Sequence, residues 1–239
     1  MSAPEKNSIS YSDYYEANLY KLQDGVLNVV KNSGVPFYLT GGTALSRAYY
    51  NHRYSDDLDF FVNRDCDFQK HVETVLSLLT NDGFVWSSDV GFVKSVDFCS
   101  VIVKRLNQDI GLKLDFVNDI AAHFGDVVPT SLFCRTDSVR NILSNKITAV
   151  FRMSPKDVVD IHRICLNESF NWSDVFTEVR EKELGVEPCD VAEIIQGIPR
   201  EAFDSIKWIR PVNFEVFKRD AGQIAKDMLS LAENSMKRV

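Results

Sequence analysis

Hydrophobic residues near the start of the chain recur three or four positions apart, and the period changes further on. The segment 12–31 has the helical spacing and predicts an amphipathic helix, which a glycine and a proline end. The run PFYLT then predicts a short buried strand that leads into Gly41 and Gly42. Residues 43–50 are helical in character, with Thr43 placed as the helix cap. The predicted order is therefore helix, strand, glycine pair and short helix.

The next part of the chain mixes one helix with several strands. LDFFVN, at 58–63, is an apolar run too short for a helix and predicts a strand, and residues 68–79 predict an amphipathic helix. From 84 to 117 apolar and polar residues alternate, which predicts further strands with a hairpin connection around 107–111. Together these elements predict a mixed sheet.

After about residue 129 the strand pattern disappears. The predicted helices are 137–151, 154–166, 173–184, 188–196 and 213–232. Ser154 and Pro155 are typical of a helix start, because proline is compatible with the first turn. The predicted fold class is therefore α+β, with a mixed β-sheet and flanking helices in residues 1–130 and a helical C-terminal domain in residues 131–239.

Composition narrows the class of protein. With 239 residues, of which 45% are hydrophobic and 26% charged, the chain can bury a large core, which excludes a disordered protein or a disulfide scaffold. Five widely spaced cysteines and four histidines form none of the usual zinc patterns, so we expect free thiols and no transition-metal site. No apolar run approaches the roughly 20 residues of a membrane span, and the opening MSAPEKNSIS has no secretory signal. We expect a cytoplasmic protein that has no membrane partner.

The net charge of −7 is unevenly distributed. Residues 1–130 hold 11 basic and 17 acidic residues, whereas residues 131–239 hold 16 and 17. An acidic chain is a poor nonspecific binder of duplex nucleic acid, because such binding needs Lys and Arg to displace counterions. One stretch of the second half carries enough cations to form an RNA-binding face: Arg135, Arg140, Lys146, Arg152 and Lys156. The alternative is an ordinary set of solvated helices.

Acidic residues gather at the start of the predicted strand 58–63. Asp57 and Asp59 are two positions apart, so in a strand they share one face and lie about 6–7 Å apart. Leu58 and Phe60 then point to the opposite face, into the core. Two such carboxylates repel each other unless a cation lies between them, and Mg²⁺ binds one or two carboxylates together with water and substrate phosphates. An isolated pair of this kind is, however, more often a solvated strand end.

A third acid and the glycine pair could complete such a site. Asp115 lies in the alternating segment LKLDF, and if its strand neighbours that of Asp59, three carboxylates could hold two metal ions. Backbone N–H groups at Gly41 and Gly42, where a helix begins, can bind a phosphate, and Thr43 adds a hydroxyl. A glycine pair alone is usually a turn, so the prediction depends on these features occurring together.

The string GGTALSRAYYNHRYSDDLDFF resembles the AbiEii/AbiGii toxin branch of the DNA polymerase β-like nucleotidyltransferase superfamily. That branch carries GGTAL followed by HR-x-S-x-DLDFF, and residues 52–61 match the second motif. A later string, KITAVFRMSPKDVVD at 146–160, resembles the K-x-x-A-x-x-R and basic-Asp-x-x-Asp motifs of the branch. The resemblance covers roughly residues 35–165 and implies a nucleotidyltransferase-type mixed sheet.

The resemblance also implies how the first motif would act. Asp57 and Asp59 would bind Mg²⁺, with Asp115 as the third metal-binding carboxylate, near the acceptor hydroxyl. The residues that would contact the phosphates of an NTP are Gly41, Gly42, Thr43, Arg53 and Ser55. For Arg53 an alternative remains open, namely an ion pair with Asp56 or Asp57.

The second motif would bind the nucleotide from the helical half. Lys146 would reach a nucleotide phosphate, unless it is an ordinary solvent-facing lysine. Asp160 or Asp157 would orient Lys146 or hold the far side of the nucleotide, and the resemblance favours Asp160. These acids follow Lys146 by 14 and 11 residues, so two helices must fold back on each other, and Ser154-Pro155 supplies the break.

The activity that the resemblance implies is a Mg²⁺-dependent transfer of an NMP from an NTP to an acceptor hydroxyl. The acceptor oxygen would attack the α-phosphorus in line and release pyrophosphate. Relatives act as toxins of toxin–antitoxin or phage-defence systems, and some add nucleotides to tRNA 3′ ends, so tRNA or another RNA and an antitoxin protein are the expected partners. Two alternatives remain: a catalytically silent or antitoxin-controlled nucleotide-binding module, and a transferase that acts on a protein or small-molecule acceptor.

Overall fold

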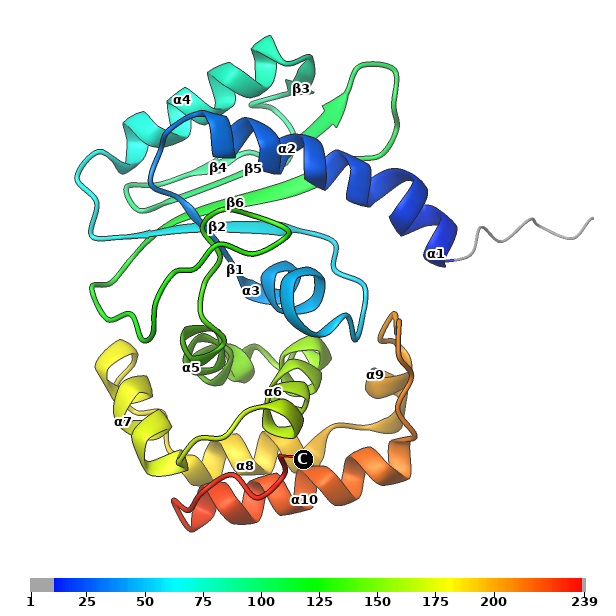
Figure 1. Ribbon diagram of the computed structural model, residues 1–239, viewed down its shortest axis with the longest axis vertical. Helices are drawn as coiled ribbons and strands as arrows, with labels where there is room; N and C mark the ends of the chain where they lie inside the picture. The colour runs from blue at the N-terminus through cyan, green and yellow to red at the C-terminus, as the bar shows by residue number, and fades with distance from the viewer. Residues whose placement is uncertain (1–10, 238–239) are drawn as a thin grey trace, which may run out of the picture.

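The computed structural model describes residues 11–237 and has a sheet half and a helical half (Figure 1). Six strands form one sheet in the order β1-β2-β6-β5-β3, with β4 paired to β5. The strands are β1 (Tyr38–Thr40), β2 (Leu58–Asn63), β3 (Phe84–Trp86), β4 (Val93–Lys94), β5 (Phe98–Arg105) and β6 (Leu112–Asp119). The β2–β6 pair is parallel, and the other pairs are antiparallel. The predicted mixed sheet is therefore confirmed.

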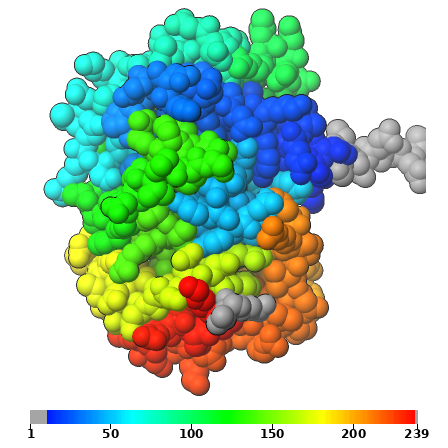
Figure 2. Space-filling model, viewed as in Figure 1, coloured from blue at the N-terminus to red at the C-terminus, as the bar shows by residue number. Residues whose placement is uncertain are grey.

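Helices cover both faces of this sheet. On one face lie α2 (Tyr20–Asn32), which continues α1 (Tyr11–Tyr14) and the π-helical stretch η1 (Tyr15–Leu19), and α4 (Phe68–Asn81). On the other face lies a short helical segment, α3 (Gly41–Thr43) followed by η2 (Ala44–Tyr50), which separates the sheet from the helical half (Figure 1). The space-filling view shows the two halves in contact along this side of the molecule (Figure 2).

Alternation along β2 decides which residues enter the core. Leu58 and Phe60 are fully buried, whereas Asp59 and Phe61 on the opposite face are only partly buried. Phe60 stacks on Phe116 of β6, with ring centroids 5.5 Å apart. Because side chains of a strand point alternately to the two faces, this aromatic packing holds the acid at position 59 on the face that the helical half approaches.

The helical half matches the predicted elements closely. Its helices are α5 (Val139–Ala149), η3 (Val150–Arg152), α6 (Pro155–Asn167), α7 (Trp172–Lys182), α8 (Pro188–Gly197), α9 (Arg200–Asp204) and α10 (Phe214–Leu229). Pro155 occupies the first turn of α6, as predicted, and α5 packs against α6 after the chain reverses at residues 153–154. Only the short α9 was not predicted, because its five residues are too few to display a hydrophobic period.

One local prediction was wrong. Thr43 does not cap the short helix, because the helix begins two residues earlier at Gly41, with Thr40 in extended conformation at the cap position. The Thr43 side chain is fully buried, and its hydroxyl donates a hydrogen bond to the backbone carbonyl of Asp57. Thr43 thereby ties the helix to the segment that enters β2.

The cysteines are free, as expected, although Cys66 and Cys189 are exposed rather than packed. The opening segment MSAPEKNSIS, on which the prediction of a missing secretory signal depends, lies outside the described residues. No helix within residues 11–237 has the length and apolar character that crossing a membrane requires.

Replacing Phe60 with alanine should destabilise the protein by about 3–5 kcal/mol, because a fully buried ring leaves a cavity in a dense aromatic core. Chemical denaturation of the purified protein measures this loss. The control is Val96→Ala, since Val96 is 80% exposed and should change the free energy of unfolding by less than about 0.5 kcal/mol. A loss below about 1 kcal/mol for Phe60→Ala would contradict the packing described.

Candidate active site

A cavity of about 250 Å³ lies between the sheet and helices α5 and α6. Its lining is unusually rich in ionisable side chains from both halves of the molecule. The acids in the lining are Asp57, Asp59, Asp115 and Asp157, and the cations are Arg53, Lys113, Lys146, Arg152 and Lys156. Gly41, Gly42 and Ser55, which the sequence predicted as phosphate contacts, also line the cavity. The acids of the sheet and most of the cations face each other across this space.

Three carboxylates form the sheet side of the cavity, which we call the acid wall: Asp57, Asp59 and Asp115. Asp57 directly precedes β2, and Asp59 lies in β2 directly opposite Asp115 in the parallel strand β6. In the described part of the chain, neither Asp57 nor Asp59 has a hydrogen-bond or ion-pair partner for its carboxylate. Burial raises the pKa of both acids, and for Asp59 burial together with repulsion from Asp115 raises the pKa to about 6. The acid wall therefore carries uncompensated negative charge.

Asp115 differs from the other two acids because both of its carboxylate oxygens have partners. The Ser100 hydroxyl of β5 donates to Oδ1 at 2.6 Å, and the Lys113 ammonium contacts Oδ2. The three carboxylates of the acid wall share one cavity but do not converge to within 4.8 Å of one another, as the ligands of a single ion would. The structure thus brings the three predicted acids to one cavity, and Lys113 contacts Asp115 there.

The glycine pair allows two charged side chains to approach the turn after β1. Gly41 has φ +69°, and a Cβ there would collide with Asp59 Oδ2. A Cβ on Gly42 would lie 2.5 Å from Arg53 Nη2 and 3.2 Å from Ser55 Oγ. The close approach of Asp59 and Arg53 therefore favours glycine at both positions, and the positive φ of Gly41 requires it there.

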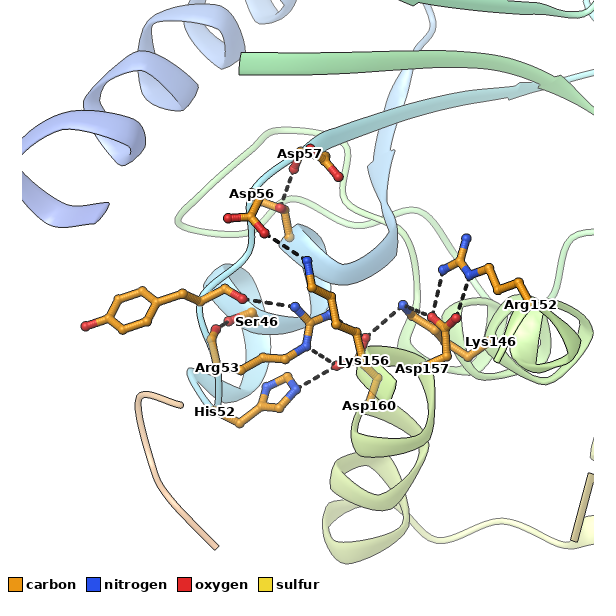
Figure 3. A network of polar contacts seen from close by, with 12 residues as sticks. Ser46, His52, Arg53, Asp56, Asp57, Lys146, Arg152, Lys156, Asp157 and Asp160 are labelled. Atoms are coloured by element: carbon orange, nitrogen blue, oxygen red, sulfur yellow. Dashed lines mark hydrogen bonds and ion pairs between the residues drawn. The ribbon is translucent and has the colours of Figure 1, made fainter. Parts of the chain in front are cut away.

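Helices α5 and α6 form much of the opposite side of the cavity. We call the charged cluster there the basic wall: Lys146, Arg152 and Asp157, with Arg53 from the loop before β2 and Asp160, which contacts Lys146 and Arg53 but does not line the cavity. Lys146 Nζ lies 2.7 Å from Asp157 Oδ1 and 2.8 Å from Asp160 Oδ2 (Figure 3). Burial alone would lower the pKa of Lys146, but Asp160 and Asp157 raise it, so the ammonium stays charged. The predicted reversal of the two helices thus brings Lys146 to both aspartates.

Arg53 makes its ion pair with Asp160 and with neither Asp56 nor Asp57. Its Nε lies 2.8 Å from Asp160 Oδ1 and its Nη2 2.7 Å from Oδ2, a bidentate pair that is almost fully buried. His52 Nε2 lies 2.8 Å from the same carboxylate (Figure 3). Burial would raise the pKa of Asp160, but Arg53 and Lys146 hold it well below its usual range. Burial lowers the pKa of His52, so this imidazole is neutral.

The cations of the basic wall outnumber its acids. Arg152 also pairs with Asp157, through Nε at 2.6 Å and Nη2 at 2.8 Å. Three cations, Arg53, Lys146 and Arg152, thus share two carboxylates, which leaves one positive charge beside the cavity. The basic wall is therefore suited to an anionic group such as a phosphate.

A second ion cluster joins the two halves beside the cavity. Lys156 Nζ lies 2.8 Å from Asp56 Oδ2, and Lys207 Nζ lies 3.1 Å from Asp56 Oδ1. The Tyr15 hydroxyl donates to Asp56 Oδ1 as well. Although burial would raise the pKa of Asp56, Lys156, Tyr15 and Lys207 lower it to about 2. These contacts of Asp56 thus hold the segment that leads into β2, directly next to Asp57.

The five cations considered as a candidate RNA-binding face differ in their partners and exposure. Arg135 donates to the backbone carbonyls of Phe37 and Val35, and Arg140 pairs with Glu178 of α7. Lys146 is buried, whereas Arg152 and Lys156 line the cavity with side chains that are 61% and 43% exposed. Helical spacing alone does not reveal which of these charges have partners in other elements.

Two residues of the site were missed in the sequence. Lys113 lies two positions before Asp115, so strand alternation places both on one face and could have identified it. Ser100 contacts Asp115 only because β5 pairs with β6 in a particular register, and no local pattern reveals that register. Of the residues that the sequence predicted for the site, all except Thr43 and Asp160 line the cavity.

The fold of this chain resembles those of proteins with solved structures. The crystal structure of JHP933 from Helicobacter pylori aligns over 93% of this chain and 94% of its own, with 18% identity and a TM-score of 0.57. Another H. pylori protein, described as a proposed nucleotidyltransferase, aligns over 91% of this chain and 96% of its own, with 19% identity and a TM-score of 0.58. No curated protein matches the chain by sequence. At this identity the two structures establish a shared fold.

The cavity thus combines acids from the sheet, a glycine turn and cations from the helical half. The model of the family described as nucleotidyl transferase AbiEii toxin, type IV toxin–antitoxin system, matches residues 28–230. The chain therefore belongs to the AbiEii family and is a nucleotidyltransferase. This confirms the family resemblance that the motifs indicated.

Replacing Asp160 with alanine should lower the free energy of unfolding by about 3–5 kcal/mol at pH 7, because Arg53 and Lys146 would be left buried without this partner. The folded-state pKa of Asp160 is depressed, so its contribution is complete above the unfolded-state pKa of about 3.9. The difference between wild type and variant should therefore stay constant from pH 8 to 5 and narrow below about pH 4. Denaturant titrations across this pH range measure it.

The matched control is Asp24→Ala. Asp24 also pairs with an arginine, Arg47, at 2.7 Å, but its side chain is 57% exposed. Such surface pairs contribute less than about 1 kcal/mol. Equal losses for Asp24→Ala and Asp160→Ala would contradict the structural role assigned to the buried pair.

Proposed function

We propose that this nucleotidyltransferase uses Mg²⁺ to move an NMP from an NTP to an acceptor hydroxyl at an RNA 3′ end, with tRNA as the acceptor. The observation that supports this most directly is the pair of opposed walls in one cavity, three carboxylates on one side and a net positive cluster on the other. A catalytically silent module would have no need to keep Asp57 and Asp59 partly buried and without partners.

The acid wall suits a hard divalent cation. Asp57, Asp59 and Asp115 supply carboxylate oxygens, the ligand type that Mg²⁺ prefers, and the raised pKa values of Asp57 and Asp59 reflect the charge that a cation would neutralise. When bound, Mg²⁺ stabilises the negative charge that develops on the phosphoryl group and orients the attacking and leaving oxygens. The residues that would hold it are Asp57, Asp59 and, once its Oδ2 is released, Asp115.

The triphosphate would lie between the two walls. Gly41, Gly42 and Ser55 would contact it from the turn after β1, where backbone N–H groups at a helix start favour anions. Lys146 would add its charge from α5, with Asp157 and Asp160 holding the ammonium in place. Arg53 acts by fixing Asp160, and it also lines the cavity next to Gly42. We therefore assign metal binding to residues 1–130 and part of the phosphate binding to residues 131–239.

The acceptor would approach the open end of the cavity. Arg152 and Lys156 are both partly exposed there and could contact RNA phosphates. We propose that the protein acts in the cytoplasm, where NTPs and tRNA are present, and that its toxicity arises from modified RNA. The type IV toxin–antitoxin description of the family supports an antitoxin partner.

Replacing Asp57 or Asp59 with asparagine should reduce transfer of labelled NMP to tRNA by at least about 100-fold, since electrostatic stabilisation of the phosphoryl group is lost. The assay incubates purified protein with each labelled NTP, Mg²⁺ and total tRNA. The melting temperature of Asp59→Asn should equal or exceed that of wild type, because the carboxylate is disfavoured in the folded state.

Asp89→Asn is the control, because Asp89 is exposed in the loop before β4 and should leave transfer unchanged. Label that appears on a protein or a small molecule and depends on the same acids would move the acceptor away from RNA. An absence of Mg²⁺-dependent transfer to every acceptor offered would contradict the enzymatic proposal and favour a binding module.

A further inference from the structure

Among the described residues, Lys113 is the cation that directly contacts a carboxylate of the acid wall. Lys113 and Asp115 are two positions apart in β6, so their side chains leave the same face of the strand. The Lys113 ammonium contacts Asp115 Oδ2 and lines the cavity together with Asp57 and Asp59. All three carboxylates act on it, since Asp115, Asp57 and Asp59 each favour its charged form. Lys113 thus stands beside the acids in the position of a counterion.

The contact blocks one specific ligand atom. Asp115 Oδ1 accepts a hydrogen bond from Ser100 at 2.6 Å, and Oδ2 accepts one from Lys113. Ser100 is 5% exposed and belongs to the neighbouring strand β5, so its hydrogen bond orients the carboxylate from the interior. Lys113 occupies the other oxygen, Oδ2. Asp115 therefore has no carboxylate oxygen free of a partner while Lys113 stays in place.

Lys113 can move without disrupting the fold. Its side chain is 45% exposed, whereas that of Asp115 is 16% exposed. The ammonium donates no hydrogen bond to any described residue apart from Asp115. When its flexible side chain rotates into solvent, only the ion pair with Asp115 is lost. Ion pairs that involve a partly exposed side chain contribute little free energy. The fixed element is Asp115 and the displaceable element is Lys113.

We propose that Lys113 is a built-in counterion that partly neutralises the acid wall when no divalent cation is bound and must leave Asp115 Oδ2 for such a cation to bind there, so that it sets the metal affinity of the enzyme. This inference rests on the proposed function, which assigns divalent-cation binding to the acid wall. It makes metal binding an exchange of one positive charge for another. An ordinary surface ion pair would instead leave metal affinity unaffected.

The test measures Mn²⁺ binding to the full-length protein without nucleotide, by isothermal titration calorimetry and by electron paramagnetic resonance of free Mn²⁺. Lys113→Met removes the charge but keeps a stem of similar length, and it should bind Mn²⁺ about 10-fold more tightly than wild type, because a competing charge within contact distance is gone. Lys113→Arg retains the charge and should bind with an affinity close to that of wild type.

Lys104→Met is the matched control. Lys104 is exposed on β5, lies on the same face of the sheet and has no ion-pair partner within residues 11–237. This variant should bind Mn²⁺ as wild type does, which excludes a general effect of the changed net charge. The second readout is thermal stability: without metal, Lys113→Met should melt below wild type, and added Mn²⁺ should raise its melting temperature by more than that of wild type.

The outcomes separate the two proposals. If wild type binds Mn²⁺ and Lys113→Met binds it with equal or lower affinity, the role of Lys113 is overturned and the proposed function stands. If neither protein binds Mn²⁺ at millimolar concentration, both proposals fail. Binding by Lys113→Met alone would support the counterion role in its strongest form. If Lys113→Met fails to fold, Lys113→Gln takes its place in the same comparisons.

Discussion

The parallel pairing of β2 with β6 is the constraint on which the site depends. It sets Asp59 directly opposite Asp115 and, one residue further along each strand, Phe60 against Phe116. The aromatic pair is buried in the core, so alternation forces the two acids onto the opposite face, where they repel each other. Hydrophobic packing on one face of the sheet thus maintains an electrostatically unfavourable arrangement on the other, as expected of a binding site for cations.

The helical half complements this arrangement through one buried network. Asp160 is held by Arg53 from the loop before β2 and by Lys146 from α5, so the residues that follow the short helix η2 are locked to α6 (Figure 3). The same loop continues through Asp56, which Lys156 and Lys207 hold from the helical side. Both halves therefore position the segment that ends at Asp57. Charge pairs between the halves determine the geometry of the cavity, and the core determines which residues face it.

The sequence predicted most of the fold because its signals are local. Alternation around Leu58 and Phe60, the glycine pair and the helical spacing after residue 137 each depend on neighbours in the chain, and the strands and helices followed them. Contacts across the chain were harder to predict. Neither the Arg53–Asp160 pair, over 100 residues apart, nor the Ser100–Asp115 hydrogen bond has a local pattern. Thr43 was misplaced because a threonine after two glycines is typical of a cap, whereas here the glycines themselves form the first turn.

The central claim is that Asp57, Asp59 and Asp115 together bind divalent cations beside the glycine turn. A crystal structure of the protein with Mn²⁺ and a nonhydrolysable NTP analogue tests it most directly, because Mn²⁺ gives an anomalous signal. We predict anomalous peaks within coordination distance of all three carboxylates, with the triphosphate between the acid wall and the basic wall. A nucleotide bound elsewhere, or Mn²⁺ ligated by other residues while these three carboxylates stay without metal, would contradict the account.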